Sequence, residues 1–142
     1  MAVLTDILIA SPAEAEAICR DLRHFERWPC LQYKSIDNIV LSDLLKALGS
    51  DEDAEDLARG GGLVFHEGQE GPWVFHLPDT LPTLLADLGD ERIPEIAVRW
   101  AQGELSYAGA QISDVEMGLR QLRDFSRQAV AANRPLLLWM SL

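Results

Sequence analysis

The chain has 142 residues, of which 48% are hydrophobic and 25% are charged, with 10 glycines and 7 prolines. This composition excludes a disordered or fibrous chain, and the length predicts that residues 1–142 form a single globular domain. The 12 basic and 23 acidic residues give a net charge of −11, which disfavours nucleic acid as a partner because the chain repels phosphates. No apolar stretch is long enough to cross a bilayer, so we expect no membrane partner either.

The first part of the chain predicts a strand, a helix and a second strand. Residues 3–9 are rich in leucine and β-branched side chains, which is typical of a buried strand. Ser11 and Pro12 then form a helix start, and this helix runs to about Arg23. After a turn, residues 31–36 predict a short strand.

The middle of the chain is strongly acidic. A short helix capped by Ser42 leads into residues 50–59, which form either a weak helix or a loop. Residues 51–98 hold 12 acidic residues against Arg59 and Arg92, a net charge of −10 that attracts basic proteins and cations. The same charges also keep a protein in solution, and the sequence leaves both roles open. The candidate partner-binding residues are the acids clustered before a run of glycines: Asp51, Glu52, Asp53, Glu55 and Asp56.

Residues 63–77 predict a β-hairpin, because two β-rich runs flank a glycine-bounded tip. If paired residue numbers sum to 139, His66 and Trp73 share one face of the hairpin and His76 lies on the other. The two histidines then cannot chelate one ion together, so we expect no metal and no cofactor. His66, Trp73 and His76 mark an alternative pocket beside this hairpin.

Two amphipathic helices follow the hairpin. The first begins at Asp79 or Thr80 and carries a leucine stripe, and the second begins at Asp90. Trp100 falls on the apolar stripe of the second helix, which predicts that its indole lies in the core.

A capping-box pattern at Ser113 predicts the start of the longest helix, which runs to about Asn133. Residues 136–140 then predict a buried strand that closes the chain, and Pro135 separates it from the helix. The periodicity of the helix places three arginines on its exposed side: Arg120, Arg123 and Arg127.

Cys19 and Cys30 are the only two cysteines, too few for a disulfide framework, and this usage fits a reducing compartment. The N-terminal residues have neither the basic segment nor the cleavage site of a secretory signal. We therefore expect a cytoplasmic protein. No serine stands in a Gly-x-Ser-x-Gly nucleophile elbow, so the sequence offers no signature of covalent catalysis.

Three segments together resemble those of a group of small acidic bacterial proteins of unassigned function. They are Gly-Pro-Trp-Val-Phe-His-Leu-Pro-Asp at 71–79, Arg-Trp-Ala-Gln-Gly-Glu-Leu at 99–105 and Arg-Pro-Leu-Leu-Leu-Trp-Met-Ser-Leu at 134–142. The resemblance spans most of the chain and implies a bacterial, cytoplasmic, single-domain protein. It implies no activity and no catalytic residues.

The sequence predicts an α+β fold: a small mixed sheet of four to five strands, including the 63–77 hairpin and the C-terminal strand, packed by about five helices. The function we expect is that of a non-enzymatic binding module, an immunity-like or antitoxin-like inhibitor that covers a basic protein partner. The alternative is a small enzyme or ligand-binding domain with a pocket near the hairpin. Association into a homo-oligomer is left open.

Overall fold

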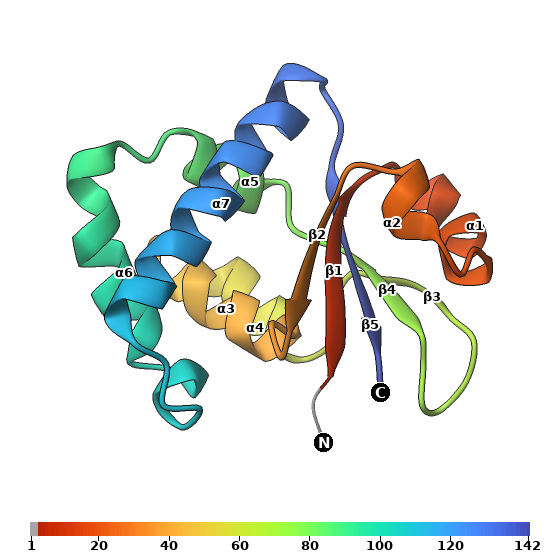
Figure 1. The fold of residues 1–142 in the computed structure, drawn as a ribbon, viewed down its shortest axis with the longest axis horizontal. Coiled ribbons are helices and arrows are strands. Elements are labelled where there is room, and N and C mark those ends of the chain that lie inside the picture. The colour runs from red at the N-terminus through yellow and green to blue at the C-terminus, as the bar shows by residue number, and fades with distance from the viewer. Residues whose placement is uncertain (1–2) are drawn as a thin grey trace.

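A computed structural model describes residues 3–142 and shows an α+β fold (Figure 1). Residues 1 and 2, which begin the segment without a secretory-signal pattern, lie outside the described residues. The strands form one five-stranded sheet in the order β2-β1-β5-β4-β3. Their bounds are β1 Leu4–Ile9, β2 Cys30–Lys34, β3 Leu63–His66, β4 Trp73–His76 and β5 Leu136–Ser141.

The prediction of a mixed sheet is wrong, because every neighbouring pair of strands is antiparallel. The first and last strands pair along their length, from Leu4 opposite Ser141 to Ile9 opposite Leu136. The chain enters β5 at the end where it leaves β1, and there the Ala10 N–H donates to the Pro135 carbonyl oxygen at 3.3 Å. An apolar pattern in the sequence locates a strand but does not give its direction in the sheet. The direction of β5 depends on the end of the sheet at which the chain enters it.

Seven α-helices lie within residues 3–142, arranged on the two faces of the sheet. Figure 1 shows α1 and α2 on one face and α3 to α7 on the other. None of the described helices has both the length and the apolar composition needed to span a membrane. The bounds are α1 Ala15–Arg20, α2 His24–Arg27, α3 Asn38–Ala47, α4 Asp51–Ala58, α5 Thr80–Ala86, α6 Ile93–Ala101 and α7 Ile112–Ala131.

The central strands β1, β5 and β4 have buried residues on both faces of the sheet, so the core has two parts. Along β1, Ile7 packs into the larger part, under α3 to α7, and Leu8 packs into the smaller part, under α1. This alternation follows the two-residue period of a strand. Trp100 is 2% exposed in the larger part, as its periodicity predicts, and its indole N–H donates to the Val40 carbonyl at 2.9 Å.

Two helix starts differ from their predictions. Helix α3 begins earlier than expected because Asp37 is its cap: the Asp37 carboxylate accepts from the Val40 N–H at 2.9 Å. Ser42 lies inside this helix, 1% exposed, and its hydroxyl donates to the Ile39 carbonyl. Helix α7 begins at Ile112, so Ser113 lies within its first turn and does not cap it.

The hairpin pairing is confirmed in part. His66 lies opposite Trp73, as predicted, but a bulge places Leu63 opposite Phe75. The turn from α4 into β3 requires glycine at position 62, where φ is +86° and an added Cβ would lie 2.5 Å from the His76 carbonyl oxygen.

Candidate functional site

The five predicted partner-binding acids lie together on helix α4. This helix turns Ala54 and Leu57 into the core, where both are fully buried. Three acids in its first turn favour the helix, because carboxylates interact well with the positive end of the helix dipole. We call the outward side of the helix the α4 acidic surface: Asp51, Glu52, Asp53, Glu55 and Asp56.

One member of this surface also has a structural role. The Asp53 carboxylate accepts hydrogen bonds from the Ser50 hydroxyl at 3.0 Å and from the Thr80 hydroxyl at 2.6 Å. Because Thr80 is the first residue of α5, this contact ties α4 to α5. The other four carboxylates lie on exposed residues.

The α4 acidic surface forms no ion pair with a basic residue in the part of the chain that the structure describes. None of the ion pairs found among residues 3–142 involves a carboxylate of this surface. Arg59, which follows α4 directly, forms no ion pair in that part of the chain either. Uncompensated charges project a field into the solvent, and this field attracts ligands of the opposite sign.

A shallow hollow of about 460 Å³ borders the N-terminal end of α4. Leu48 and Leu84 supply half-buried apolar surface, and the Asp79 side chain, 83% exposed, supplies a carboxylate. Lysine and arginine side chains combine an apolar stem with a charged tip. The hollow therefore has the chemistry to hold a basic side chain next to the α4 acidic surface.

Of the three residues of the alternative pocket, the structure pairs His66 with Trp73 across the hairpin and places His76 apart from them. His66 is exposed, whereas Trp73 is half-buried and packs against the larger core. His76 lines a different hollow, beside Arg134, and its Nε2 lies 3.2 Å from the Asp79 carboxylate. These side chains therefore form no common site.

A further hollow, called the α1–α2 groove below, lies on the α1–α2 face of the sheet. It measures about 610 Å³, and Pro72 is its contribution from the hairpin. Its lining includes a buried pair, Asp6 and His24, each 5% exposed, whose Oδ2 and Nε2 atoms lie 2.5 Å apart. Sequence reasoning missed this pair, although an aspartate in an otherwise apolar strand was a usable signal.

The imidazole of this hollow is engaged, whereas the buried indole N–H of Trp139, which also lines the hollow, has no hydrogen-bond partner among residues 3–142. His24 uses both ring nitrogens, because Nδ1 also lies 3.2 Å from the Asp21 carbonyl oxygen. Burial, reinforced by the charge of Glu67, raises the pKa of the Cys19 thiol to about 11. Burial and then the charge of Asp6 raise the pKa of Cys30 to about 12. The Cys19 thiol that lines this hollow is therefore protonated near neutral pH, and the His24 ring is bonded through both of its nitrogens.

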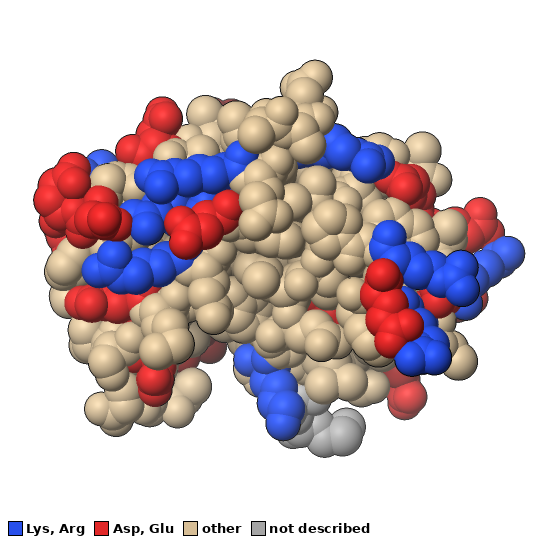
Figure 2. All heavy atoms as spheres, turned by 45° about the horizontal axis from the view of Figure 1, so that its top comes forward, with Lys and Arg blue, Asp and Glu red and all other residues tan. Residues whose placement is uncertain are grey.

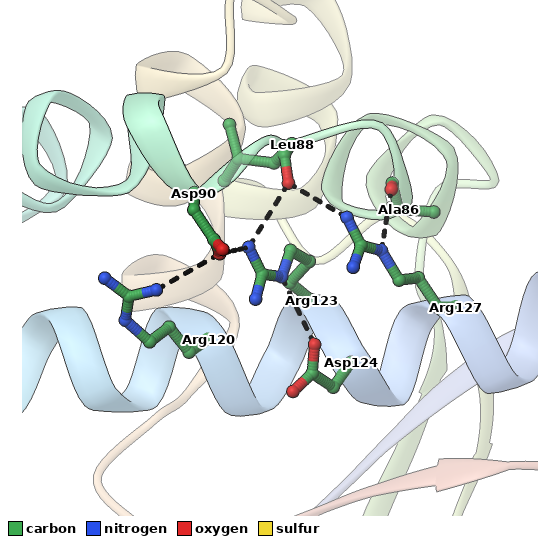
Figure 3. A network of polar contacts seen from close by, with 7 residues as sticks. All are labelled: Ala86, Leu88, Asp90, Arg120, Arg123, Asp124 and Arg127. Atoms are coloured by element: carbon green, nitrogen blue, oxygen red, sulfur yellow. Dashed lines mark hydrogen bonds and ion pairs between the residues drawn. The ribbon is translucent and has the colours of Figure 1, made fainter.

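The arginines of α7 form a network of polar contacts with the end of α5 and with Asp90 (Figure 3). The prediction that Arg123 lies exposed is wrong: it is 7% exposed, and it bonds Asp90 at 2.5 Å and the Leu88 carbonyl at 3.4 Å. Arg127 donates to the Ala86 and Leu88 carbonyls at 3.0 and 3.2 Å. The arginines thereby satisfy carbonyl groups at and just beyond the C-terminal end of α5, which a helix leaves without partners.

The charges in this network stabilise one another. Hydrogen bonding to Arg123, followed by its charge, holds the pKa of Asp90 below its usual range. The bond to Asp90 in turn raises the pKa of Arg123. Because these charges are neutralised within the molecule, this network is structural and leaves little field for a partner.

The described residues place no three His, Cys, Asp or Glu side chains together in a group that holds a metal ion. Comparison of the chain with protein-family models, with curated proteins and with solved structures finds no match. The resemblance to small acidic bacterial proteins therefore stays a prediction, and an assignment of function depends on the geometry of the site.

Proposed function

We propose that this protein is a non-enzymatic binding protein that docks a basic protein partner on the α4 acidic surface, in the manner of an immunity protein or an antitoxin. The observation that carries the proposal is the lack of any basic partner for these carboxylates within residues 3–142. Arginines elsewhere in the chain pair with acids, as Arg20 does with Glu16 and Arg134 with Glu14.

The hollow beside α4 gives the proposal a contact geometry. A lysine or arginine of the partner lays its stem against Leu48 and Leu84 and directs its charge to Asp79. The α4 acidic surface lies beside that contact, because Asp53 is bonded to Thr80 of the lining, and its carboxylates add further negative charge there. Such complementarity raises association rates and selects against acidic partners.

The chemistry of the α1–α2 groove supports a binding function over a catalytic one. His24 is saturated by Asp6 and the Asp21 carbonyl, and the raised pKa values keep both thiols protonated near neutral pH. A cytoplasmic location is part of the proposal, because Cys19 and Cys30 are both free thiols.

The proposal is tested by three immobilised proteins exposed to the same native lysate. The first is the wild type. The second is neutralised on the α4 acidic surface by Asp51→Asn, Glu52→Gln, Asp53→Asn, Glu55→Gln and Asp56→Asn. The third is a matched control with the same change in net charge at exposed acids outside α4 that form no ion pair among residues 3–142: Glu70→Gln, Asp87→Asn, Glu91→Gln, Glu104→Gln and Asp114→Asn.

We expect the wild type and the matched control to retain a basic protein that is eluted by salt. The α4-neutralised protein should fail to retain it. Its association rate with the purified wild type should fall steeply with salt, because exposed charges are screened beyond about 8 Å at physiological ionic strength. Equal retention of the same proteins by all three would reject the α4 acidic surface as the docking site.

A further inference from the structure

Strand β2 lies at one edge of the sheet and pairs only with β1 (Figure 1). The pairing runs without a register shift, and at one end of it the Ser35 N–H donates to the Val3 carbonyl oxygen at 2.8 Å. In an antiparallel pair, every second residue bonds to the neighbouring strand, and the residues between them point their N–H and carbonyl groups away from it. Counted back from Ser35, the residues that point to the free edge are Cys30, Gln32 and Lys34.

These outward backbone groups are open. None of them has a backbone hydrogen-bond partner on the free side among residues 3–142, and Gln32 and Lys34 are exposed. The opposite edge of the sheet differs, because β3 is only four residues long and a bulge interrupts its pairing with β4. A bulge of this kind protects an edge from pairing with another chain. The regular β2 edge is therefore the one that can accept a further strand.

The charges along β2 suit contact between two copies of this acidic chain. Residues 28–36 hold no acidic residue, and Lys34 is their one base, so the carboxylates behind the net charge of −11 are absent from this edge. If β2 pairs with a second β2 antiparallel about Gln32, each Lys34 lies opposite Cys30 of the other copy. The two lysines then lie at opposite ends of the strand pair. Like charges directly opposite one another destabilise a strand pair, and this register avoids them.

Exposed apolar side chains lie beside the same edge. Leu4, Leu22 and Phe25 line the α1–α2 groove and are 49%, 92% and 41% exposed. Leu4 pairs with Lys34 of β2, and Phe25 belongs to α2, which packs against β2. A twofold axis perpendicular to the sheet keeps the same face of both copies on one side, so the two α1–α2 grooves adjoin across the contact. Clustered exposed apolar groups are typical of a protein interface.

We propose that this protein forms a symmetric dimer in which the β2 strands of two copies pair antiparallel about Gln32 and join the two sheets into one. Each Gln32 exchanges both backbone hydrogen bonds with its counterpart, and each Cys30 does so with Lys34 of the other copy. Main-chain hydrogen bonds of this kind give strand addition its affinity. The contact uses the same strand of both copies, so it closes at two chains. It does not involve α4, so the dimer and the proposed function can each fail without the other.

The test compares the wild type with Gln32→Pro and Gln32→Ala by sedimentation velocity over a range of protein concentrations. Proline removes the outward N–H, and an edge strand tolerates it where that N–H faces solvent. Alanine is the matched control, because it also removes the glutamine side chain but keeps the N–H. Circular dichroism establishes that each variant is folded. Hydrogen exchange followed by NMR compares the amides of β2 in dilute and concentrated wild type.

We expect the wild type to pass from monomer to dimer as its concentration rises, and Gln32→Ala to associate within about threefold of it. Gln32→Pro should associate at least about fivefold more weakly, because each dimer loses two hydrogen bonds. The amides of Gln32 and Lys34 should exchange more slowly in the concentrated wild type, whereas those of Leu31 and Tyr33, which bond to β1, should be protected at both concentrations.

This exchange pattern decides the question if Gln32→Pro does not fold. Three results would each overturn the proposal. The first is a wild type that stays monomeric up to about 1 mM. The second is a dimer that Gln32→Pro leaves equally tight. The third is a dimer in which the amides of Gln32 and Lys34 exchange as fast as they do in the monomer.

Discussion

Helices α7 and α4 both carry clustered like charges, and they use them in opposite ways. On α7, Arg120, Arg123 and Arg127 direct their guanidinium groups onto Asp90 and onto carbonyl groups of residues 86 and 88. Figure 2 shows the same pattern at larger scale, because acidic and basic side chains lie against one another over α6–α7 and over α1–α2. On α4, the carboxylates form no ion pair with a basic residue among residues 3–142.

The contrast separates charges that hold the fold from charges that face outward. A charged group that is buried or bonded to carbonyl oxygens contributes to stability, and its removal leaves partners unsatisfied. An exposed carboxylate without a partner contributes little to stability, and its effect is felt by molecules that approach from solution. Substitutions in the two classes should therefore act on different quantities.

The largest loss of stability is expected at the most deeply buried of the side-chain contacts, between Asp6 and His24. Asp6→Ala leaves the buried imidazole of His24 without its carboxylate partner, which should cost free energy of unfolding near the upper end of about 1–3 kcal/mol. Urea denaturation measures the free energy of unfolding. A cost below 1 kcal/mol would place this pair among the charges that do not hold the fold.

A smaller loss is expected at Arg123. Arg123→Met keeps the length of the stem but removes the bonds to Asp90 and to the Leu88 carbonyl, which should cost about 1–3 kcal/mol. Thermal and urea denaturation both report this change. The exposed Arg127, changed to Met, is the control and should cost less.

The contribution of Asp90 to the stability of the folded protein should depend on pH. Its pKa is lowered in the folded protein, so its contribution is fully present above the ordinary aspartate pKa of about 3.9 and is lost as the pH falls through the lower folded value. Asp90→Asn should therefore lower the Tm at pH 7, and the difference from wild type should shrink below about pH 4. A difference that is constant from pH 7 to pH 2.5 would contradict this account.

The smallest effect on stability is expected from the α4-neutralised protein. Four of its five changed residues are exposed and lack an ion pair, and Asn at position 53 still accepts from Thr80. The free energy of unfolding should change by less than about 0.5 kcal/mol, as for ordinary surface substitutions. A larger loss would assign α4 a structural role like that of α7.

The sequence predicted those features that depend on local periodicity. The apolar stripe of α7, the core position of Trp100 and the closing strand are all found in the structure. Features that depend on distant partners were not predictable. Arg123 falls near the edge of the stripe, and its burial depends on Asp90, which lies 33 residues earlier.

The same distinction applies to the candidate sites. The sequence predicted the acidic cluster of α4 because its members are close together in the chain. It did not decide whether residues 50–59 form a helix or a loop. The Asp6–His24 pair joins residues that lie 18 positions apart in the chain, and the hollow beside α4 joins the end of α3 to the start of α5. Such groupings arise from the packing of helices on the sheet, which periodicity alone does not fix.

The central claim is that the charge of the α4 acidic surface faces a basic partner, and hexalysine binding tests it most directly. Calorimetric titration at low salt compares the wild type, the α4-neutralised protein and the matched control. The two variants differ from the wild type by the same change in net charge. We predict that the α4-neutralised protein binds hexalysine at least about tenfold more weakly than the wild type, and that the matched control weakens by less than about threefold. An equal loss in both variants would contradict the claim, because only the overall net charge would then matter.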